Sequence, residues 1–171
     1  IMSPKSLLRN KRAVSSKEDF VNGSTFHRVL WDDAEKGNSI TKLQKDSKIK
    51  RVVICSGKIY FDLLNEREQR EISDIYLLRL EQFYPFPALS FIKELSRFKD
   101  AEFVWCQEEP KNQGGWSFVD PNLEWSLNRV KAKYKRARYV GRSAAASPAT
   151  GLATQHKKQQ EMIIDEALTI D

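Results

Sequence analysis

Apolar residues occur along this chain in short blocks of two kinds. Continuous apolar or aromatic runs predict buried strands at 51–55, 75–80, 103–106 and 138–141. After each run, apolar residues recur every three or four positions, which predicts amphipathic helices at 60–67, 89–98, 116–130 and up to about 168. Repeated alternation of strand and helix predicts an α/β fold of three layers, a mostly parallel sheet with helices on both faces.

The spacing also predicts which side chains of two helices face the core. In the second helix the apolar stripe consists of Leu89, Ile92, Leu95 and Phe98. In the last helix the residues expected to face inward are Met162, Ile163, Ala167 and Leu168.

Residues 1–50 are less regular than the rest. Residues 26–31 alternate loosely and predict an edge strand, and 32–48 are polar and predict a loop or linker. We therefore expect 1–50 to be linker and edge elements leading in from a preceding domain, and 51–171 to form the α/β domain. The first residue is Ile1 and not methionine, so we expect the chain to be part of a longer polypeptide.

The stretch from Phe103 to Trp125 has the sharpest change of character. Its apolar start predicts a strand, 107–112 predict a polar turn stopped by Pro110, and Gly114-Gly115 precede a helix whose apolar positions begin at Trp116. This order describes the carboxyl end of a strand in an α/β sheet. Such strand ends are where these sheets place binding and assembly surfaces.

Composition narrows the class of protein. The 171 residues are 40% hydrophobic and 11% aromatic, with seven Gly and six Pro, as in a globular domain. No apolar run approaches the roughly 18 residues needed to cross a bilayer, so we expect no membrane partner. Cys55 and Cys106 lack CxxC spacing and predict a reduced, cytoplasmic protein.

The formal charge of +6 is concentrated in residues 5–12 and 129–142. A solvated basic face and an anionic partner both explain it. The run at 129–142 also includes Tyr134 and Tyr139, which could stack on bases, so nucleic-acid binding is an alternative. Because that run spans a helix end, a loop and a strand, we expect no nucleic-acid partner.

Candidate catalytic groups are few. His27 and His156 lack an acidic or cysteine neighbour in sequence, and a surface or structural role is favoured for both. Cys106 follows Trp105 and is interpreted as a small core residue. Zinc-ligand spacings and glycine-rich phosphate loops are absent from the sequence, so we expect no metal site.

Glu108 and Glu109 allow two interpretations. Packed like charges raise the pKa of one carboxyl, so the pair could transfer protons. Alternatively one caps the next helix or pairs with Lys111, while the other faces solvent. Gly115 could admit a ligand or a second subunit, and Trp116 belongs to a residue type enriched at interfaces.

Several longer motifs cover the chain in order. They are P-K-S-L-L-R at 4–9, C-S-G-K at 55–58, E-Q-F-Y-P-F-P at 81–87, W-C-Q-E-E-P-K-N at 105–112, G-R-S-A-A-A-S-P-A-T-G at 141–151 and Q-E-M-I-I-D-E-A at 160–167. Together they resemble the C-terminal region of the thiamine-dependent component of 2-oxoglutarate dehydrogenase.

The resemblance implies a transketolase-type C-terminal domain in each subunit of a homodimer. It implies a parent enzyme that decarboxylates 2-oxoglutarate on thiamine diphosphate and Mg²⁺. The succinyl group then passes to a lipoyl-bearing succinyltransferase, within the citric acid cycle. The expected compartment is the cytoplasm, or the mitochondrial matrix in a eukaryote.

The resemblance assigns no catalytic, cofactor-binding or metal-binding residue to this segment. The thiamine and Mg²⁺ motif of the family contains Gly-Asp-Gly, which this sequence lacks, and the catalytic histidines of the family precede this region. We expect the segment alone to be inactive. Glu108, Glu109, Gly115 and Trp116 are expected at the subunit interface. Some relatives bind acetyl-CoA or a nucleotide, so Arg9, Arg142 and Ser143 are expected to hold effector phosphate.

The alternative hypothesis is a stand-alone nucleotide- or CoA-binding regulatory module of the same fold.

Overall fold

The computed structural model describes residues 3–37 and 39–170 and folds them around a five-stranded sheet. The strands are β1 (Val29–Leu30), β2 (Arg51–Cys55), β3 (Ile75–Leu80), β4 (Glu102–Pro110) and β5 (Arg138–Arg142). Their order in space is β1-β3-β2-β4-β5. β2 to β5 are parallel, and β1 pairs with β3 in the antiparallel sense at the edge. The mostly parallel sheet is thus confirmed.

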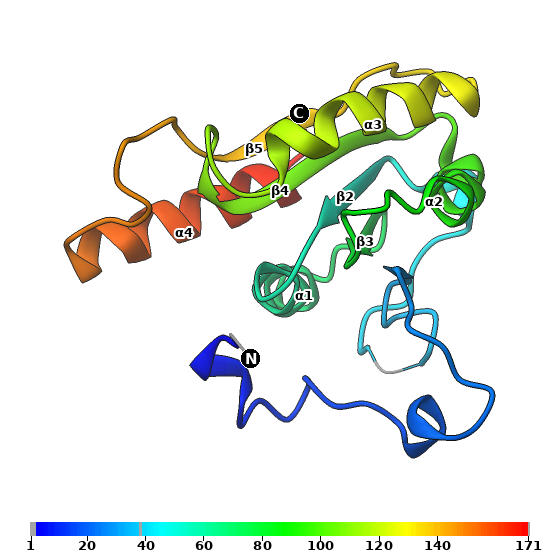
Figure 1. The fold of residues 1–171 in the computed structure, drawn as a ribbon, viewed down its shortest axis with the longest axis horizontal. Coiled ribbons are helices and arrows are strands. Elements are labelled where there is room, and N and C mark those ends of the chain that lie inside the picture. Colours follow the sequence, from blue (N-terminus) through cyan, green and yellow to red (C-terminus); the bar gives the residue numbers. More distant parts are fainter. Residues whose placement is uncertain (1–2, 38, 171) are drawn as a thin grey trace.

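Helices cover both faces of this sheet. The α-helices are α1 (Ile59–Gln69), α2 (Ala88–Leu95), α3 (Trp116–Arg129) and α4 (Ala153–Leu168). Short 3₁₀ helices are η1 (Lys5–Leu7), η2 (Lys17–Phe20), η3 (Asp46–Lys48) and η4 (Ser96–Phe98). α1 and α4 pack on one face and α2 and α3 on the other, and Figure 1 shows α3 above β4 and α4 below it. The three-layer architecture is confirmed.

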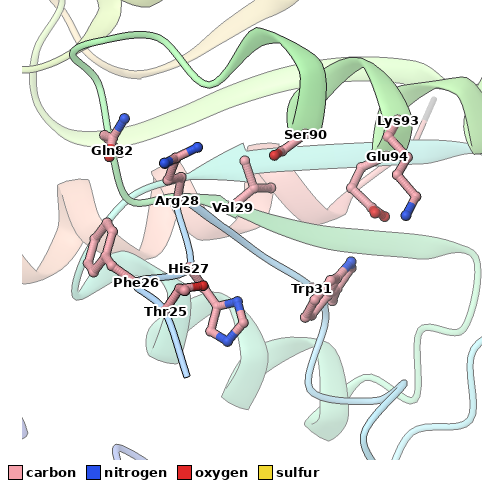
Figure 2. Close-up of a pocket in the computed structure, with 10 residues that line it drawn as sticks. All are labelled: Thr25, Phe26, His27, Arg28, Val29, Trp31, Gln82, Ser90, Lys93 and Glu94. Carbon is pink, nitrogen blue, oxygen red and sulfur yellow. The ribbon is translucent and has the colours of Figure 1, made fainter. Parts of the chain in front are cut away.

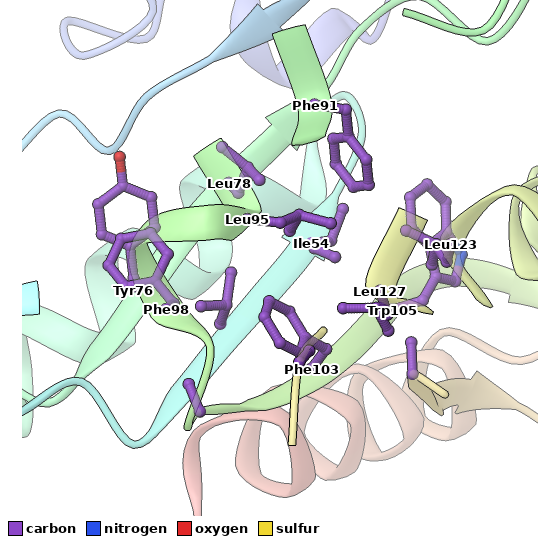
Figure 3. Close-up of a cluster of buried hydrophobic side chains, with 14 of the residues drawn as sticks. Ile54, Tyr76, Leu78, Phe91, Leu95, Phe98, Phe103, Trp105, Leu123 and Leu127 are labelled. Atoms are coloured by element: carbon purple, nitrogen blue, oxygen red, sulfur yellow. The ribbon is translucent and has the colours of Figure 1, made fainter. Parts of the chain in front are cut away.

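The position of β2 at the centre of the sheet explains why its sequence is apolar at consecutive positions. Val52 and Ile54 belong to the hydrophobic cluster under α2 and α3, whereas Val53 and Cys55 belong to the cluster under α1 and α4. All four are fully buried. Figure 3 shows the first cluster, in which Ile54 lies among side chains from both the strands and the helices. Each such aliphatic side chain contributes about 1.5–3 kcal/mol on burial.

The strand that begins near Phe103 is longer than predicted. β4 runs to Pro110, so the expected polar turn at 107–112 is wrong over its first four residues. Gln107 and Pro110 are buried, and Pro110 pairs with Arg142 of β5. Proline fits because the pairing of β4 with β5 is irregular between Cys106 and Pro110, and proline is tolerated where the ladder is interrupted.

Two predicted core positions are wrong. Met162 is 61% exposed and Leu89 is 87% exposed, while Ile163 of α4 and Phe91 of α2 are buried. Neighbouring helix positions differ by about 100°, so Met162, one position before Ile163, and Leu89, two positions before Phe91, point away from the core. The inward positions of Ile163, Ala167, Leu168, Leu95 and Phe98 are confirmed.

The segment before β2 is irregular, as predicted, but part of it is built into the core. Asp32 and Arg67 are both fully buried and form an ion pair. The Asp32 carboxylate also accepts hydrogen bonds from the backbone N–H groups of Leu77, at 2.8 Å, and Ala34, at 2.9 Å. A second guanidinium bond goes to the carbonyl of Ile75, at 3.2 Å. The division at residue 50 stays a prediction, and its expected start at Ile1 lies outside the described residues.

Other ion pairs hold the 32–48 loop against the helices. Arg97 of η4 donates to Asp46, with Nε 2.9 Å from Oδ2, and also pairs with Glu35. Nearer the N-terminus, Arg12 forms a two-pronged pair with Glu68 of α1, at 2.6 and 2.7 Å.

The Glu68 pair makes the attachment of the N-terminal residues depend on pH. Hydrogen bonds from Arg12, and further ones from Ser39 and the backbone of Ile40, outweigh partial burial and lower the pKa of Glu68 to about 2. The unfolded glutamate has a pKa of about 4.3. A lowered pKa stabilises the folded chain above the unfolded value, and this contribution is lost as pH falls towards the folded value.

We therefore expect the Glu68→Gln variant to be less stable than the parent chain at pH 6. The difference in free energy of unfolding should shrink between about pH 5 and pH 2. Urea denaturation across this range measures it. The exposed Glu161→Gln variant is the control, and a stability gap for Glu68→Gln that is independent of pH would contradict the assignment.

Candidate functional site

The topology brings the carboxyl ends of β2, β4 and β5 to one edge of the sheet. The chain goes from β2 outward to β3, then crosses back to β4 on the other side of β2. The point where strand order reverses, between β2 and β4, is where open α/β sheets bind ligands. The residues at this edge are Lys58, which follows β2, Glu108 near the end of β4, and Arg142 at the end of β5.

Lys58 and Glu108 are joined in a polar cluster. The Lys58 ammonium lies 2.8 Å from Glu108 and 2.8 Å from Asp62 of α1. Gln160 of α4 donates to both carboxylates, at 3.0 and 3.1 Å. Partial burial lowers the pKa of Lys58, but the bonds to Asp62 and Glu108 outweigh it and raise the pKa above its ordinary value. The cluster therefore keeps Lys58 charged and ties α1, β4 and α4 together.

Arg142 is also held by its own chain. Its Nε donates to Gln159 at 2.9 Å, one Nη donates to the backbone carbonyl of Glu108, and the other donates to Gln160 at 3.0 Å. His156 Nδ1 lies 3.4 Å from the same group. An incoming phosphate would have to take over some of these bonds.

Next to Arg142 is a cavity of about 400 Å³, between the end of β5, the following loop and α4. Its lining includes Arg142, Ser143, Gln155, Gln159 and Met162. Two of the predicted phosphate-binding residues are thus brought together at one cavity. The third, Arg9, is exposed and is not among the lining residues.

The two adjacent glutamates face different layers. Glu108 contacts Lys58 and α4, whereas the Glu109 side chain lies beside Gly114, in the turn that leads to α3. Successive strand residues point to opposite faces, so the carboxyls do not form a proton-sharing pair. The interpretation in which one is paired and the other faces solvent fits better, although the partner of Glu108 is Lys58 and not Lys111.

Gln107 is the residue here that sequence reasoning missed. It is buried, and its side-chain oxygen accepts hydrogen bonds from Trp105 Nε1, at 2.9 Å, and from the backbone of Trp116, at 3.0 Å. Its amide nitrogen donates to the carbonyls of Glu109, Pro110 and Gln113. Gln107 thus fixes both the turn and the start of α3. The only sequence signal was its place next to an aromatic strand.

Gly115 and Trp116 are packed by residues of the same chain. A Cβ on Gly115 would lie 2.8 Å from the Phe83 ring and 3.1 Å from the Trp105 ring. Trp116 is half-buried, with its ring 5.3 Å from that of Tyr139. Their expected place at a subunit interface, like that of Glu108 and Glu109, stays a prediction.

The remaining candidate residues, which are the histidines, the cysteines and the basic run, are in surroundings that favour structural roles. His27 and His156 are exposed, as expected for surface residues. Burial raises the pKa of both Cys55 and Cys106, which keeps them as thiols in the core. In the basic run, Arg136 pairs with Asp120, and Arg138 pairs with Glu102 and Glu166.

Within 3–37 and 39–170, no group of three or more His, Cys, Asp or Glu side chains is arranged to hold a metal ion. None of the helices in these ranges is long and apolar enough to cross a membrane.

The tight packing at Gly115 leads to a stability prediction. We expect Gly115→Ala to lower the free energy of unfolding by about 1–3 kcal/mol, because the new methyl group overpacks against two rings. Gly151→Ala is the matched control, since nothing lies within 4 Å of its added Cβ. Urea denaturation compares the two. Equal stability of both variants would show that Phe83 and Trp105 give way freely.

Comparison with known proteins identifies the family of this chain. The model of the 2-oxoglutarate dehydrogenase C-terminal family matches residues 14–168. The chain is 61% identical, over 170 residues, to proteins named 2-oxoglutarate dehydrogenase E1 component from Brucella anthropi, Brucella ovis and Brucella abortus. The match covers 98% of this chain and 17% of each relative, so the chain spans about a sixth of their length. This chain belongs to the 2-oxoglutarate dehydrogenase C-terminal family.

Proposed function

We propose that the chain works as the C-terminal domain of a 2-oxoglutarate dehydrogenase E1-type enzyme. Such an enzyme decarboxylates 2-oxoglutarate and passes the succinyl group to the lipoyl group of a succinyltransferase, in the citric acid cycle. The observation that carries the proposal is the 61% identity to E1 components over 98% of the chain. The same observation favours it over the stand-alone regulatory module, since the matched proteins are about six times longer.

The described residues do not fit thiamine diphosphate and Mg²⁺. Glu108 and Asp62 at the sheet edge are already bound to Lys58 and Gln160, and Asp32 is bound to Arg67 in the core. We infer that the rest of the enzyme holds both groups, and no catalytic step is assigned to residues of this chain.

Assembly is the role proposed for the end of β4 and the start of α3. Glu109 is exposed, and Glu108 and Trp116 are partly exposed, so all three are available to a second subunit. Phe118 and Trp125 extend this surface along α3, with 40% and 53% exposure. Gly115 contributes by allowing α3 to begin close to Phe83 and Trp105.

Effector binding is proposed at the cavity beside Arg142 and Ser143. Its volume of about 400 Å³ suits part of a nucleotide, and the Arg142 guanidinium supplies charge-assisted donors for a phosphate of acetyl-CoA or AMP. Binding would exchange the Gln159 and Gln160 bonds for phosphate. Arg9 would take part only if the rest of the enzyme brought it near.

The proposed partners are the preceding domains, the second subunit of a homodimer and the lipoyl-bearing succinyltransferase, with neither nucleic acid nor membrane. The proposed compartment in a bacterium is the cytoplasm.

A hybrid enzyme tests the proposed function. In it, this chain replaces the matching segment of the Brucella anthropi E1 component. Because most positions are identical, we expect 2-oxoglutarate-dependent reduction of an artificial electron acceptor within about tenfold of the unmodified enzyme.

The Brucella anthropi protein without the segment is the control, and it should be inactive. A hybrid that folds and forms dimers but has no activity would contradict the proposal.

A further inference from the structure

The N-terminal segment, residues 3–28, leaves many apolar side chains uncovered. It runs over the surface below α1 in Figure 1, and almost all of it is exposed. Large apolar side chains that are 58–77% exposed occur at five of its positions, which are Leu8, Val14, Phe20, Val21 and Phe26. An accumulation of exposed apolar groups marks an interaction site.

The same segment is also positively charged. It has two acidic residues and six basic ones, a net charge of +4, whereas the whole chain has +6. Arg12 is neutralised by Glu68, which leaves the rest of the excess on the surface. A partner that covers this segment should therefore present acidic groups around apolar ones.

A cavity of about 870 Å³ separates this segment from α1 and β3. Aromatic side chains from both sides line it, among them Phe20, Phe26, Trp31 and Phe61. Lys11, Lys36 and Arg79 add positive charge to its lining.

Arg79 is the unusual group in this cavity. Its side chain is 13% exposed, its guanidinium lies 4.0 Å from the centre of the Tyr60 ring, and its ion-pair distance to Asp33 is 3.6 Å. Its Nε is buried and has no hydrogen-bond partner. A guanidinium held this way has donors to spare for a carboxylate, which it can bind through two parallel bonds.

A second cavity, of about 440 Å³, lies on the other side of residues 25–31. Figure 2 shows the rings of His27 and Trp31 on one side of this strip, while Arg28 lies towards Gln82 and Ser90. Phe26 lines both cavities. Residues 25–31 therefore form a ridge with one cavity on each side.

We propose that residues 11–31, together with these two cavities, are the docking face for the remainder of the E1-type polypeptide. That remainder places a carboxylate on Arg79 and apolar side chains against Phe20 and Phe26. The inference rests on the proposed function. The curated relatives have more than four fifths of their length outside the matched segment, enough to cover this face. A second copy of the face is disfavoured as occupant, since residues 11–31 carry four basic and two acidic residues and two such positive surfaces repel.

Radical footprinting on the hybrid enzyme tests the proposal. In it, oxidation of Phe20 and Phe26 should be about fivefold slower than in the 171-residue chain alone, because an interface excludes water. Phe98, which is 1% exposed, is the internal reference for folding in both samples.

Variants of the hybrid identify the contacts. Arg79→Gln and Phe20→Asp should return the oxidation rate of Phe26 to that of the free chain, with Phe98 still protected. Leu89→Asp is the matched control, an exposed apolar residue outside the face, and it should leave Phe26 protected.

The outcomes separate the two proposals. An active hybrid in which Phe20 and Phe26 react as fast as in the free chain would overturn the docking face and leave the proposed function standing. An inactive hybrid in which both rings are protected would support the docking face and count against the proposed function.

Discussion

The buried pair of Asp32 and Arg67 is the contact on which the arrangement of this chain depends. It joins three parts distant in sequence, since Arg67 is on α1, Asp32 follows β1, and the same carboxylate binds the backbone of β3 at Leu77. Taking two charges out of water is costly, so such a pair adds little net stability, but losing one partner strands the other charge in the core. The pair therefore fixes the position of residues 29–34 relative to α1 and β3.

This constraint carries over to the surfaces that we connect with function. Because Asp32 is anchored, the adjoining residues 25–31 lie beside β3 as a ridge with a cavity on each side. At the carboxyl end of β4, Gln107 plays a similar positioning role through uncharged hydrogen bonds, which connect the end of β4 to the start of α3. The two polar anchors thus position the proposed docking face and the proposed subunit interface, while the apolar clusters between them hold the sheet and its helices together.

The sheet and its helices were predictable because their cause is local. A strand covered on both faces needs apolar residues at consecutive positions, and 52–55 show this directly. The length of β4 could not be predicted, because Gln107 is a polar residue. It is accommodated in the core only because its side chain forms hydrogen bonds with five specific partners. The Asp32–Arg67 pair was invisible for a similar reason: 35 positions separate the two residues, and only the fold makes them neighbours. Of the predicted phosphate-binding residues, Arg142 and Ser143 are adjacent in sequence and so reached the same cavity, whereas Arg9 depends on tertiary placement.

We infer from this pair that residues 29–34 belong to the same cooperative unit as the sheet. Native-state hydrogen exchange tests it at the amide of Ala34, which donates to Asp32. We predict an opening free energy equal, within about 1 kcal/mol, to that of the Val53 amide in the central strand, since both should exchange only on global unfolding. In the Arg67→Met variant, exchange at Ala34 should become faster than at Val53. Exchange of Ala34 in the unmodified chain at the rate of an open loop, with Val53 still protected, would contradict the claim.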